Sequence, residues 1–167
     1  MSTLEIKKQR LADSVGEFIK YWGFKEIHGR VWIHIYLAEH PVTAKELTDK
    51  LGVTKGLISV TLSELIAYQV VEKVRTGNAK SPGYQSNTDL VEVIYNILRN
   101  RELKLTSKIQ KNIQELSDEL DDSEQQMHQK LNKLYDMTNF AVDSLKKLLN
   151  NKVISANRFK TIMRLIS

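Results

Sequence analysis

The stretch TAKELTDKLGVTKGLISVTLSEL, residues 43–65, predicts two short helices joined by a tight turn. Thr43 and Glu46 have the spacing of a capping box, so they predict the start of the first helix. Gly52 predicts its end, because glycine accepts the left-handed conformation found just past a helix. Thr54 can then cap a second helix. The apolar side chains of this second helix recur at helical spacing and predict one buried face: Ile58, Leu62, Leu65 and Ile66.

The opposite face of the second helix carries side chains that are small or basic. These residues are Lys55, Gly56, Ser59, Val60 and Ser63. Such a face can enter the major groove of DNA without a steric or electrostatic penalty. This is the layout of a helix-turn-helix whose second helix reads DNA, although two short helices around a glycine turn also occur in ordinary helical domains.

A predicted β-hairpin follows the second helix at once. The β-branched run VVEKVR, residues 70–75, leads into TGNAKSPG and then YQSN, residues 84–87. A strand, a loop rich in turn residues and a second strand make a hairpin, and a hairpin after a helix-turn-helix makes a winged helix. We expect the wing to contain Arg75, Asn78 and Lys80. The candidates for phosphate or base contacts elsewhere are Thr43, Thr54 and Ser59, with Lys55, Gly56, Val60 and Ser63 facing the groove.

Amphipathic helices are predicted before this hairpin and its helix-turn-helix. Ser2 and Glu5 have capping-box spacing, and apolar residues follow at helical spacing as far as Trp22. Gly23 ends this first helix. A second helix is expected over about residues 26–39, because Pro41 stops it.

Longer helices are predicted after the hairpin. The chain has no glycine or proline after Gly83, so a helix of about eight turns or more is expected from Asn87 or Thr88. A break near residues 121–123 precedes a further helix, and a last short helix is expected from about Ser155. The further helix carries a heptad seam made of Met127, Leu131, Leu134, Thr138, Ala141, Leu145 and Leu148.

We therefore expect a mainly α-helical chain with a small β-hairpin wing: a winged helix-turn-helix with long N- and C-terminal helices that form a dimerisation region. The expected domains are an N-terminal dimerisation helix over 1–23, a DNA-binding domain over 24–87 and a C-terminal helical dimerisation region over 88–167. The outer helices carry more apolar seam than one small core can cover, and a homodimer would bury the surplus. An intramolecular bundle, in which the C-terminal helices pair within the chain, is the alternative.

Composition excludes several other classes of protein. The chain of 167 residues has no cysteine, which removes disulfides, thiol catalysis and zinc-thiolate sites. It has no apolar run of membrane-spanning length and no signal-peptide pattern, so we expect a cytoplasmic protein with no membrane contact. The net charge of +5 permits nucleic-acid binding. Bases gather in residues 73–87, whereas residues 115–124 hold six acids and no base.

The sequence carries no catalytic constellation. We find no phosphate-binding glycine loop, no nucleophile motif and no metal-ligand spacing, and no pair of acids is placed for acid–base work. His28, His34 and His40 fall six residues apart, so they do not share one helix face. We therefore expect neither an enzyme nor a resident metal or cofactor.

Several short runs resemble one bacterial family. They are WGF at 22–24, GR at 29–30, ELTDKLGVTKGLIS at 46–59, LSEL at 62–65, Asp89-Leu90 and ILRNRE at 97–102. Over about residues 19–102 the chain resembles the MarR superfamily of winged helix-turn-helix transcriptional regulators, and within it the GbsR-like branch. The resemblance implies a dimeric repressor that binds a pseudo-palindromic operator in double-stranded DNA. The alternative is a helical protein-interaction adaptor that uses a winged-helix fold without DNA.

Two positions depart from the wider superfamily. Many members have an arginine in the middle of the second helix and an Asp-x-Arg wing tip, where this chain has Val60 and Asn78-Ala79-Lys80. The outer face offers no arginine, asparagine or glutamine, which are the side chains that read guanine and adenine with paired hydrogen bonds. We therefore expect few direct contacts between side chains and bases. Much of the affinity should come from phosphate contacts and DNA shape.

Aromatic residues gather near the join of the first two helices. Tyr21 accompanies four candidate ligand-binding residues, which are Trp22, Phe24, Trp32 and Tyr36. The family resemblance implies an effector related to osmoprotectants and their quaternary-ammonium precursors, and aromatic faces attract such cations. Plain core packing at a helix junction is the alternative.

Overall fold

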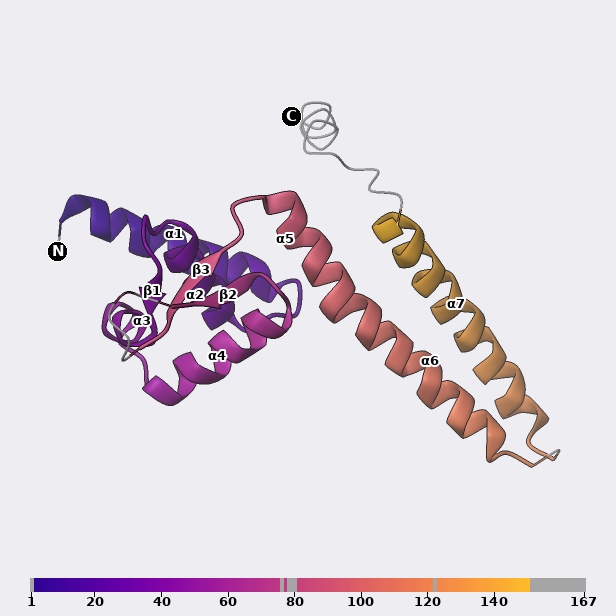
Figure 1. The fold of residues 1–167 in the computed structure, drawn as a ribbon. Coiled ribbons are helices and arrows are strands. Elements are labelled where there is room, and N and C mark those ends of the chain that lie inside the picture. The colour runs from indigo at the N-terminus through magenta and orange to yellow at the C-terminus, as the bar shows by residue number, and fades with distance from the viewer. Residues whose placement is uncertain (1, 76, 78–80, 122, 151–167) are drawn as a thin grey trace. The chain divides into compact units, whose positions relative to one another are not determined.

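The computed structural model describes residues 2–75, 77, 81–121 and 123–150 (Figure 1). It divides into two compact units, Met1–Leu90 and Val91–Ser167. The described part is mainly helical and has one small antiparallel sheet, which confirms the predicted fold class. The last helix predicted from Ser155 lies outside the described residues.

The first unit contains the predicted helix-turn-helix. Its elements are α1 (Thr3–Lys20), α2 (Glu26–Tyr36), β1 (Val42–Thr43), α3 (Ala44–Leu51), α4 (Lys55–Ala67), β2 (Val71–Val74) and β3 (Gly83–Ser86). Thr43 caps α3, Thr54 caps α4, and Gly52 between them has a left-handed backbone with φ of 62°. The sequence prediction is thus confirmed for both helices and for the turn. The predicted second helix is shorter than expected and ends at Tyr36 rather than at residue 39.

The sheet forms the wing and joins it to the helix-turn-helix. Its strand order is β1-β3-β2, and the β2–β3 hairpin is the predicted wing. Strand β1 is an addition that the sequence did not reveal, because it has only two residues. Val42 pairs with Tyr84 and Thr43 with Gly83, so the start of α3 is held beside the base of the wing.

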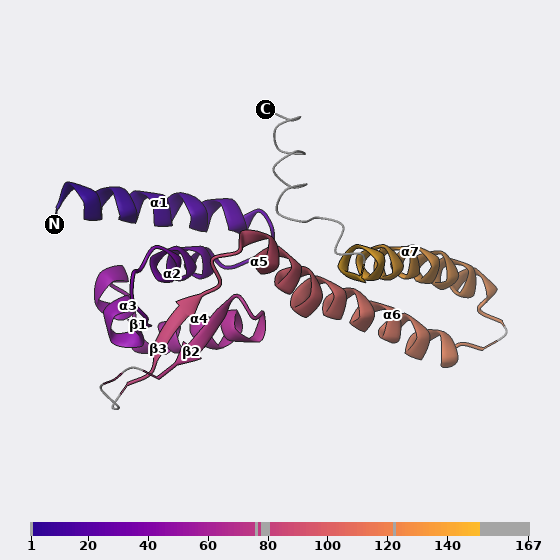
Figure 2. The ribbon, with the colours of Figure 1, turned by 45° about the horizontal axis from the view of Figure 1, so that its top comes forward.

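The core of the first unit lies between α2, α3, α4 and the sheet (Figure 2). Ile58 and Leu62 of α4 are almost completely buried, as their helical spacing predicted, and Leu47 of α3 is buried beside them. Thr61 of α4 is also buried. The buried face of α4 is therefore formed by the residues whose periodic spacing predicted it.

Helix α1 packs on α2 at backbone contact distance. Gly16 and Gly29 face each other so closely that a Cβ atom on Gly29 would lie 2.8 Å from the Cα atom of Gly16. Ala12 is buried in the same contact. Helix α1 therefore belongs to the same compact unit as the winged helix, while its other face leaves Leu4 and Phe18 exposed.

The second unit is a helical hairpin. Helix α5 (Leu90–Ile97), a π-helical turn η1 (Leu98–Glu102) and α6 (Leu103–Asp118) form a continuous run, and α7 (Gln125–Asn150) returns antiparallel beside α6 (Figures 1 and 2). This run confirms the predicted long helix. It starts later than predicted, because the Asn87 side chain accepts a hydrogen bond from the Asp89 backbone N–H at 2.8 Å in a local turn. The π-helical turn was not predicted.

Helices α6 and α7 pair within the chain through a regular seam. On α6 the buried and half-buried residues are Leu103, Thr106, Gln110, Ile113 and Ser117, and Leu120 follows just past its end. On α7 they include Leu131, Tyr135, Thr138, Val142, Leu145 and Leu149. These residues recur at alternating spacings of three and four, which suits a helix–helix seam. The predicted α7 seam was partly wrong, since Leu134 and Met127 are exposed. The intramolecular alternative therefore holds for this helix pair.

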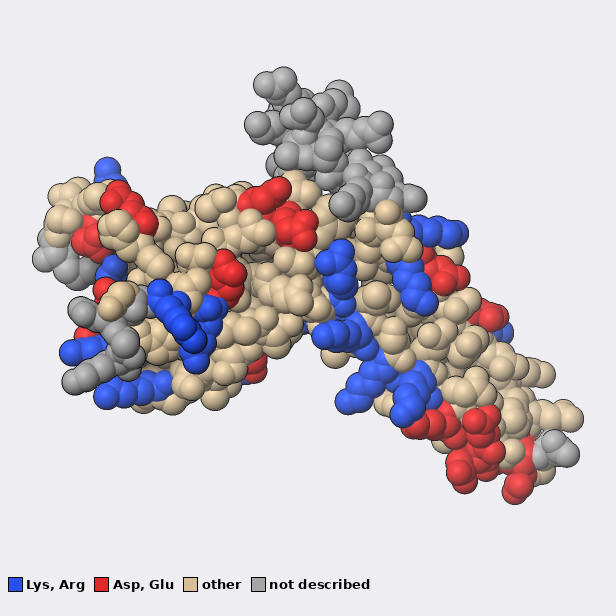
Figure 3. Space-filling view, viewed as in Figure 1, with Lys and Arg blue, Asp and Glu red and all other residues tan. Residues whose placement is uncertain are grey.

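Charge is separated along α6. Figure 3 shows basic side chains over its first part and acidic side chains gathered toward its far end. The exposed bases are Lys104, Lys108 and Lys111, and the exposed acids that follow are Glu115, Asp118 and Glu119.

Candidate nucleic-acid interface

The outer face of α4 is exposed as the sequence predicted. Thr54, Lys55, Gly56, Ser59, Val60 and Ser63 are all exposed. The exposed fraction of Val60 is 53% and that of Leu57 is 39%. The prediction did not include Leu57, because its place between the buried and exposed faces gives no periodic signal. Together these residues form a small, acid-free surface on the second helix of a helix-turn-helix.

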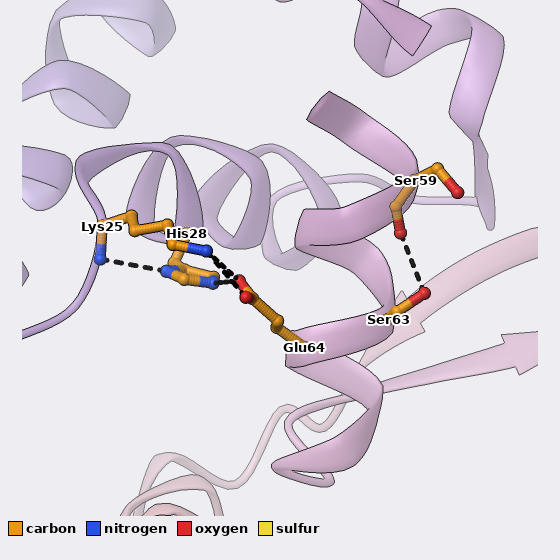
Figure 4. A network of polar contacts seen from close by, with 5 residues as sticks. All are labelled: Lys25, His28, Ser59, Ser63 and Glu64. Atoms are coloured by element: carbon orange, nitrogen blue, oxygen red, sulfur yellow. Dashed lines mark hydrogen bonds and ion pairs between the residues drawn. The ribbon is translucent and has the colours of Figure 1, made fainter. Parts of the chain in front are cut away.

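Two hydroxyl groups at this surface are already engaged by the α4 backbone. Ser63 Oγ donates to the carbonyl oxygen of Ser59 at 2.9 Å (Figure 4). Thr54 Oγ1 accepts from the backbone N–H of Leu57 at 3.2 Å. A serine hydroxyl has one hydrogen and two lone pairs, so Ser63 in this rotamer offers acceptor capacity to a ligand.

Thr43 is occupied as a helix cap. Its hydroxyl accepts from the Glu46 N–H at 3.2 Å and donates to Glu46 Oε2 at 2.8 Å. The Thr43 backbone N–H also donates to Glu46 Oε2 at 2.6 Å, and these bonds lower the pKa of the Glu46 carboxyl. The Thr43 hydroxyl hydrogen is therefore engaged by the Glu46 carboxylate. The contact of Thr43 with phosphate stays a prediction.

The wing is anchored to α2 through one serine. Trp32 Nε1 donates to Ser86 Oγ at 2.9 Å, and Ser86 Oγ donates to the Val70 carbonyl at 3.0 Å. Arg75, just past β2, is exposed, whereas Asn78 and Lys80 lie outside the described residues. The base of the hairpin is therefore fixed to the helical core beside an exposed basic residue.

A buried histidine ties α4 to α2. His28 is only 3% exposed, and its Nε2 lies 2.5 Å from Glu64 Oε2 on α4 (Figure 4). The Lys25 backbone N–H donates to His28 Nδ1 at 3.1 Å, so Nδ1 is the acceptor and Nε2 carries the hydrogen. The histidine therefore joins the start of α2 to α4, a contact that the sequence had not indicated.

Lys25 completes this contact, which we call the α2–α4 clamp (Lys25, His28 and Glu64). Lys25 Nζ lies 2.7 and 3.0 Å from the two carboxylate oxygens of Glu64. The Lys25 hydrogen bond, with a smaller contribution from His28, lowers the pKa of Glu64. Glu64 is the one carboxylate on the second half of α4, and it is paired with Lys25 and His28. This pairing weakens the repulsion between its negative charge and a nearby phosphate.

The predicted aromatic group divides into separate contacts. Trp32 stacks on Tyr36 with ring centroids 5.2 Å apart, whereas Trp22 contacts Phe18, and Phe24 contacts His28 and Tyr68. Among the four candidate ligand residues, only Trp32 and Tyr36 share a ring contact within the described chain. The effector cage stays a prediction.

Other kinds of site find no support in the described residues. They contain no group of three or more His, Cys, Asp or Glu side chains able to hold a metal ion. None of their helices has the length and apolar character needed to cross a membrane.

His34 Nε2 lies 3.3 Å from Gln9 Oε1 on α1. Burial, aided by the charge of Lys50, lowers the pKa of His34.

The α2–α4 clamp makes a testable contribution to stability. We expect Glu64→Ala to lower the free energy of unfolding by about 1–3 kcal/mol, because the buried His28 Nε2–H loses its acceptor. Glu64→Gln keeps an acceptor and should cost less. Urea unfolding measures both variants, and Glu115→Gln, which removes an exposed ion pair on α6, is the matched control.

The same contact predicts a pH dependence. The folded chain lowers the pKa of Glu64 below its ordinary 4.5, so it favours the carboxylate more than the unfolded chain does. The stabilisation is therefore complete above about pH 4.5 and is lost as the pH falls through the lower folded value. The difference between wild type and Glu64→Gln should shrink in acid, and a constant or growing difference contradicts this assignment.

Comparison with known proteins gives one curated relative and a set of similar structures. No family model matches the chain. The HTH-type transcriptional repressor OpcR of Bacillus subtilis is 24% identical over 159 residues, covering 89% of this chain and 85% of the relative. A crystal structure of a transcriptional regulator superposes with a TM-score of 0.71 at 13% identity, covering 88% of this chain and 98% of that one.

A MarR structure from E. coli is also similar, with 20% identity over 76% of this chain and 86% of that one, but its TM-score of 0.41 is too low to establish a common overall fold. The fold of the transcriptional regulator and the curated repressor agree with the resemblance drawn from the helix-turn-helix and wing. By sequence this chain is similar to an HTH-type transcriptional repressor, and by fold it is similar to a solved transcriptional regulator.

Proposed function

We propose that this protein is a cytoplasmic, DNA-binding transcriptional repressor of the GbsR-like branch, which acts as a homodimer on a pseudo-palindromic operator. The observation that carries this proposal is the outer face of α4. It is exposed, free of acids and held in place by a buried opposite face, beside a wing with an exposed Arg75. This combination suits a helix that enters a major groove while the wing contacts the backbone or minor groove.

The chemistry of α4 favours indirect reading of DNA. Lys55 is the one base on its outer face, and Val60 offers methyl groups that suit the methyl group of thymine. Ser63, as an acceptor, suits the amino group of adenine or cytosine. Few base contacts are available, so phosphate contacts and DNA shape would supply much of the affinity.

A second copy would complete the reading of an operator. One winged helix reads few base pairs, and two-fold symmetric dimers bind half-sites about one helical turn apart, or a multiple of it. Both units leave apolar side chains in solvent that a partner could cover, with Phe18 62% exposed on α1 and Phe140 74% exposed on α7. These faces support a homodimer.

The adaptor alternative has less support. The named relative is a transcriptional repressor, and no feature of the described surface favours a protein partner over DNA at α4. Binding through phosphates must weaken as salt rises, whereas apolar docking to a protein need not. A salt series therefore separates the two.

An effector with a quaternary-ammonium-like cation belongs to the same proposal. A hollow of about 840 Å³ in the first unit is lined by Tyr36, Glu39 and Glu72 among others. An aromatic ring and two carboxylates would attract a cation, against the opposing charge of Lys73 on the same lining. Trp32 does not line this hollow, and its hydrogen bond to Ser86 makes it a wing anchor, so Tyr36 is the better residue to change.

The division between phosphate and base contacts can be tested by selecting sequences from random DNA. We expect Lys55→Ala and Arg75→Ala to weaken binding to selected and random DNA alike, and to lower the salt slope by about one for each lost phosphate contact. Val60→Ala should instead relax the preference at a thymine, at a cost of about 1 kcal/mol.

Two outcomes of this selection contradict the proposal. A wild-type chain that enriches no sequence at all is not a sequence-specific regulator. If Arg75→Ala changes the selected sequence while Val60→Ala leaves it unchanged, the wing reads the bases and the assigned roles are reversed. Glu17→Gln on α1, an exposed change away from α4 and the wing, is the control.

The effector is tested by melting temperature. We expect choline-like quaternary ammonium compounds to raise the melting temperature of the wild type, because a ligand that binds only the folded chain stabilises it. Tyr36→Ala should remove the shift, whereas Phe140→Ala, an exposed aromatic change on α7, should keep it. The absence of any shift across a panel of such compounds would show that these rings serve packing alone.

A further inference from the structure

The fold of the first unit gives no reason for a glycine at position 56. Gly56 lies in the first turn of α4, and its φ is not positive, unlike those of Gly23 and Gly52. A Cβ atom built on Gly56 would meet no atom within 4 Å, whereas one on Gly29 would lie 2.8 Å from the Gly16 Cα. Neither the backbone conformation nor the packing therefore requires the absence of a side chain here.

Gly56 begins the line of α4 that points directly away from the core. Successive helical residues lie about 100° apart around the axis, so the mean direction of the buried residues defines an opposite line. The buried residues are Ile58, Thr61, Leu62 and Leu65. The exposed residues within about 30° of the opposite direction are Gly56, Val60, Ser63 and Ala67. A partner that receives the outer face of α4 therefore meets this line first.

This outermost line is lowest at its first residue. Gly56 carries no side chain, whereas Val60, one turn later on the same line, is 53% exposed. Lys55 and Leu57 are both exposed and lie about 100° away from Gly56, one on each side of it around the helix. The backbone of α4 is therefore bare at Gly56 and flanked there by two long side chains.

The dimensions of B-form DNA give this arrangement a consequence. The major groove is about 12 Å wide and about 8.5 Å deep, and a helix with its side chains is about 10–12 Å across. A helix in the groove therefore fills its width, so phosphates lie beside its flanks and base edges lie under its outermost line. On α4 that line begins at Gly56, where no side chain separates the backbone from the base edges. Lys55, on the flank, would face a phosphate.

From these observations we propose that Gly56 sets the depth at which α4 enters the major groove, with base edges in contact with the Gly56 Cα. The first turn of α4 then lies deeper than the last, where Ala67 carries a side chain on the same line. Gly56 has no side chain that could hydrogen-bond a base, so it determines specificity by shape: it fits a base edge that a larger residue would push away. This role rests on the proposed DNA binding and deepens it.

The depth at Gly56 also controls the contact assigned to Val60. The two residues lie about one turn apart on the same line, which is about 6 Å along the helix axis. A side chain added at position 56 would lift the first turn of α4 and move the Val60 methyl groups away from a thymine methyl group. The two positions should therefore be coupled in their effects on the affinity for DNA.

Substitutions that enlarge position 56 test this role in the full chain. Gly56→Ala and Gly56→Leu add side chains of two sizes, and both new residues are better helix formers than glycine. Neither change should lower the melting temperature, because a Cβ atom at this position meets no other atom within 4 Å. For each variant, binding is measured at one salt concentration to random DNA and to the sequence that the wild type selects from it.

We expect Gly56→Ala to bind the selected sequence about tenfold more weakly than the wild type, and Gly56→Leu about 100-fold more weakly, in the range of a single mismatched base pair. Binding to random DNA should change less than about twofold, because it arises from phosphate contacts. In the Gly56→Leu background, Val60→Ala should weaken binding little further, since the contact of Val60 with the base is already lost.

Two matched controls lie in the same helix-turn-helix. Ala67→Leu adds a side chain of the same size to the same line at the last turn of α4, and it should change the affinity for the selected sequence less than about twofold. Gly52→Ala replaces a second glycine that meets no atom within 4 Å. Because Gly52 has a left-handed φ of 62°, this change should lower the melting temperature, while the folded protein keeps its affinity for DNA.

Three results would overturn this role of Gly56: a Gly56→Leu variant that binds the selected sequence as tightly as the wild type, equal losses of affinity for selected and random DNA, or a loss with Ala67→Leu as large as that with Gly56→Leu. If the wild type selects a sequence and any of these results is found, the proposed function stands and the role of Gly56 does not. A wild type that selects no sequence removes both.

Discussion

The burial of one face of α4 is the constraint on which the rest of the first unit depends. Ile58 and Leu62 are held in the core, so the opposite face of the same helix must remain in solvent. Apolar burial fixes which side faces outward, but it constrains sliding and rotation of a helix less strictly than directional hydrogen bonds do. The α2–α4 clamp supplies that direction through the buried His28.

The start of α3 and the base of the wing are fixed in a similar way. Thr43 both caps α3 and pairs with β3, so one residue sets the position of a helix and of the sheet. Trp32 donates a hydrogen bond to Ser86 on β3, and Ser86 donates one to the carbonyl of Val70, which lies between α4 and β2. The outer face of α4 and the wing are therefore carried by one connected set of contacts.

Local chemistry explains how much of this unit was predictable. Caps, the left-handed Gly52 and the period of the buried residues are all encoded within a few positions, so the helix-turn-helix was predicted correctly. Contacts between distant residues leave no such local pattern. His28 and Glu64 are 36 positions apart, and neither the clamp nor the short β1 strand could be found from spacing alone.

The second unit shows where periodicity is ambiguous. A helix with two apolar stripes gives a pattern that satisfies more than one seam, so Leu134 was grouped with Leu131 although only Leu131 faces α6. The distinction depends on which stripe has a partner in the same chain.

Entry of the exposed face of α4 into the major groove of DNA is the proposed basis of recognition. The chain has no cysteine, so Val60→Cys provides a single attachment point for a DNA-cleaving probe, and Lys20→Cys on α1 provides a control. With a selected operator, we expect cleavage from position 60 at two symmetric major-groove positions, about one helical turn apart or a multiple of it, and none from position 20. Cleavage from position 20 alone, or bound DNA left uncut by the probe at position 60, would contradict it.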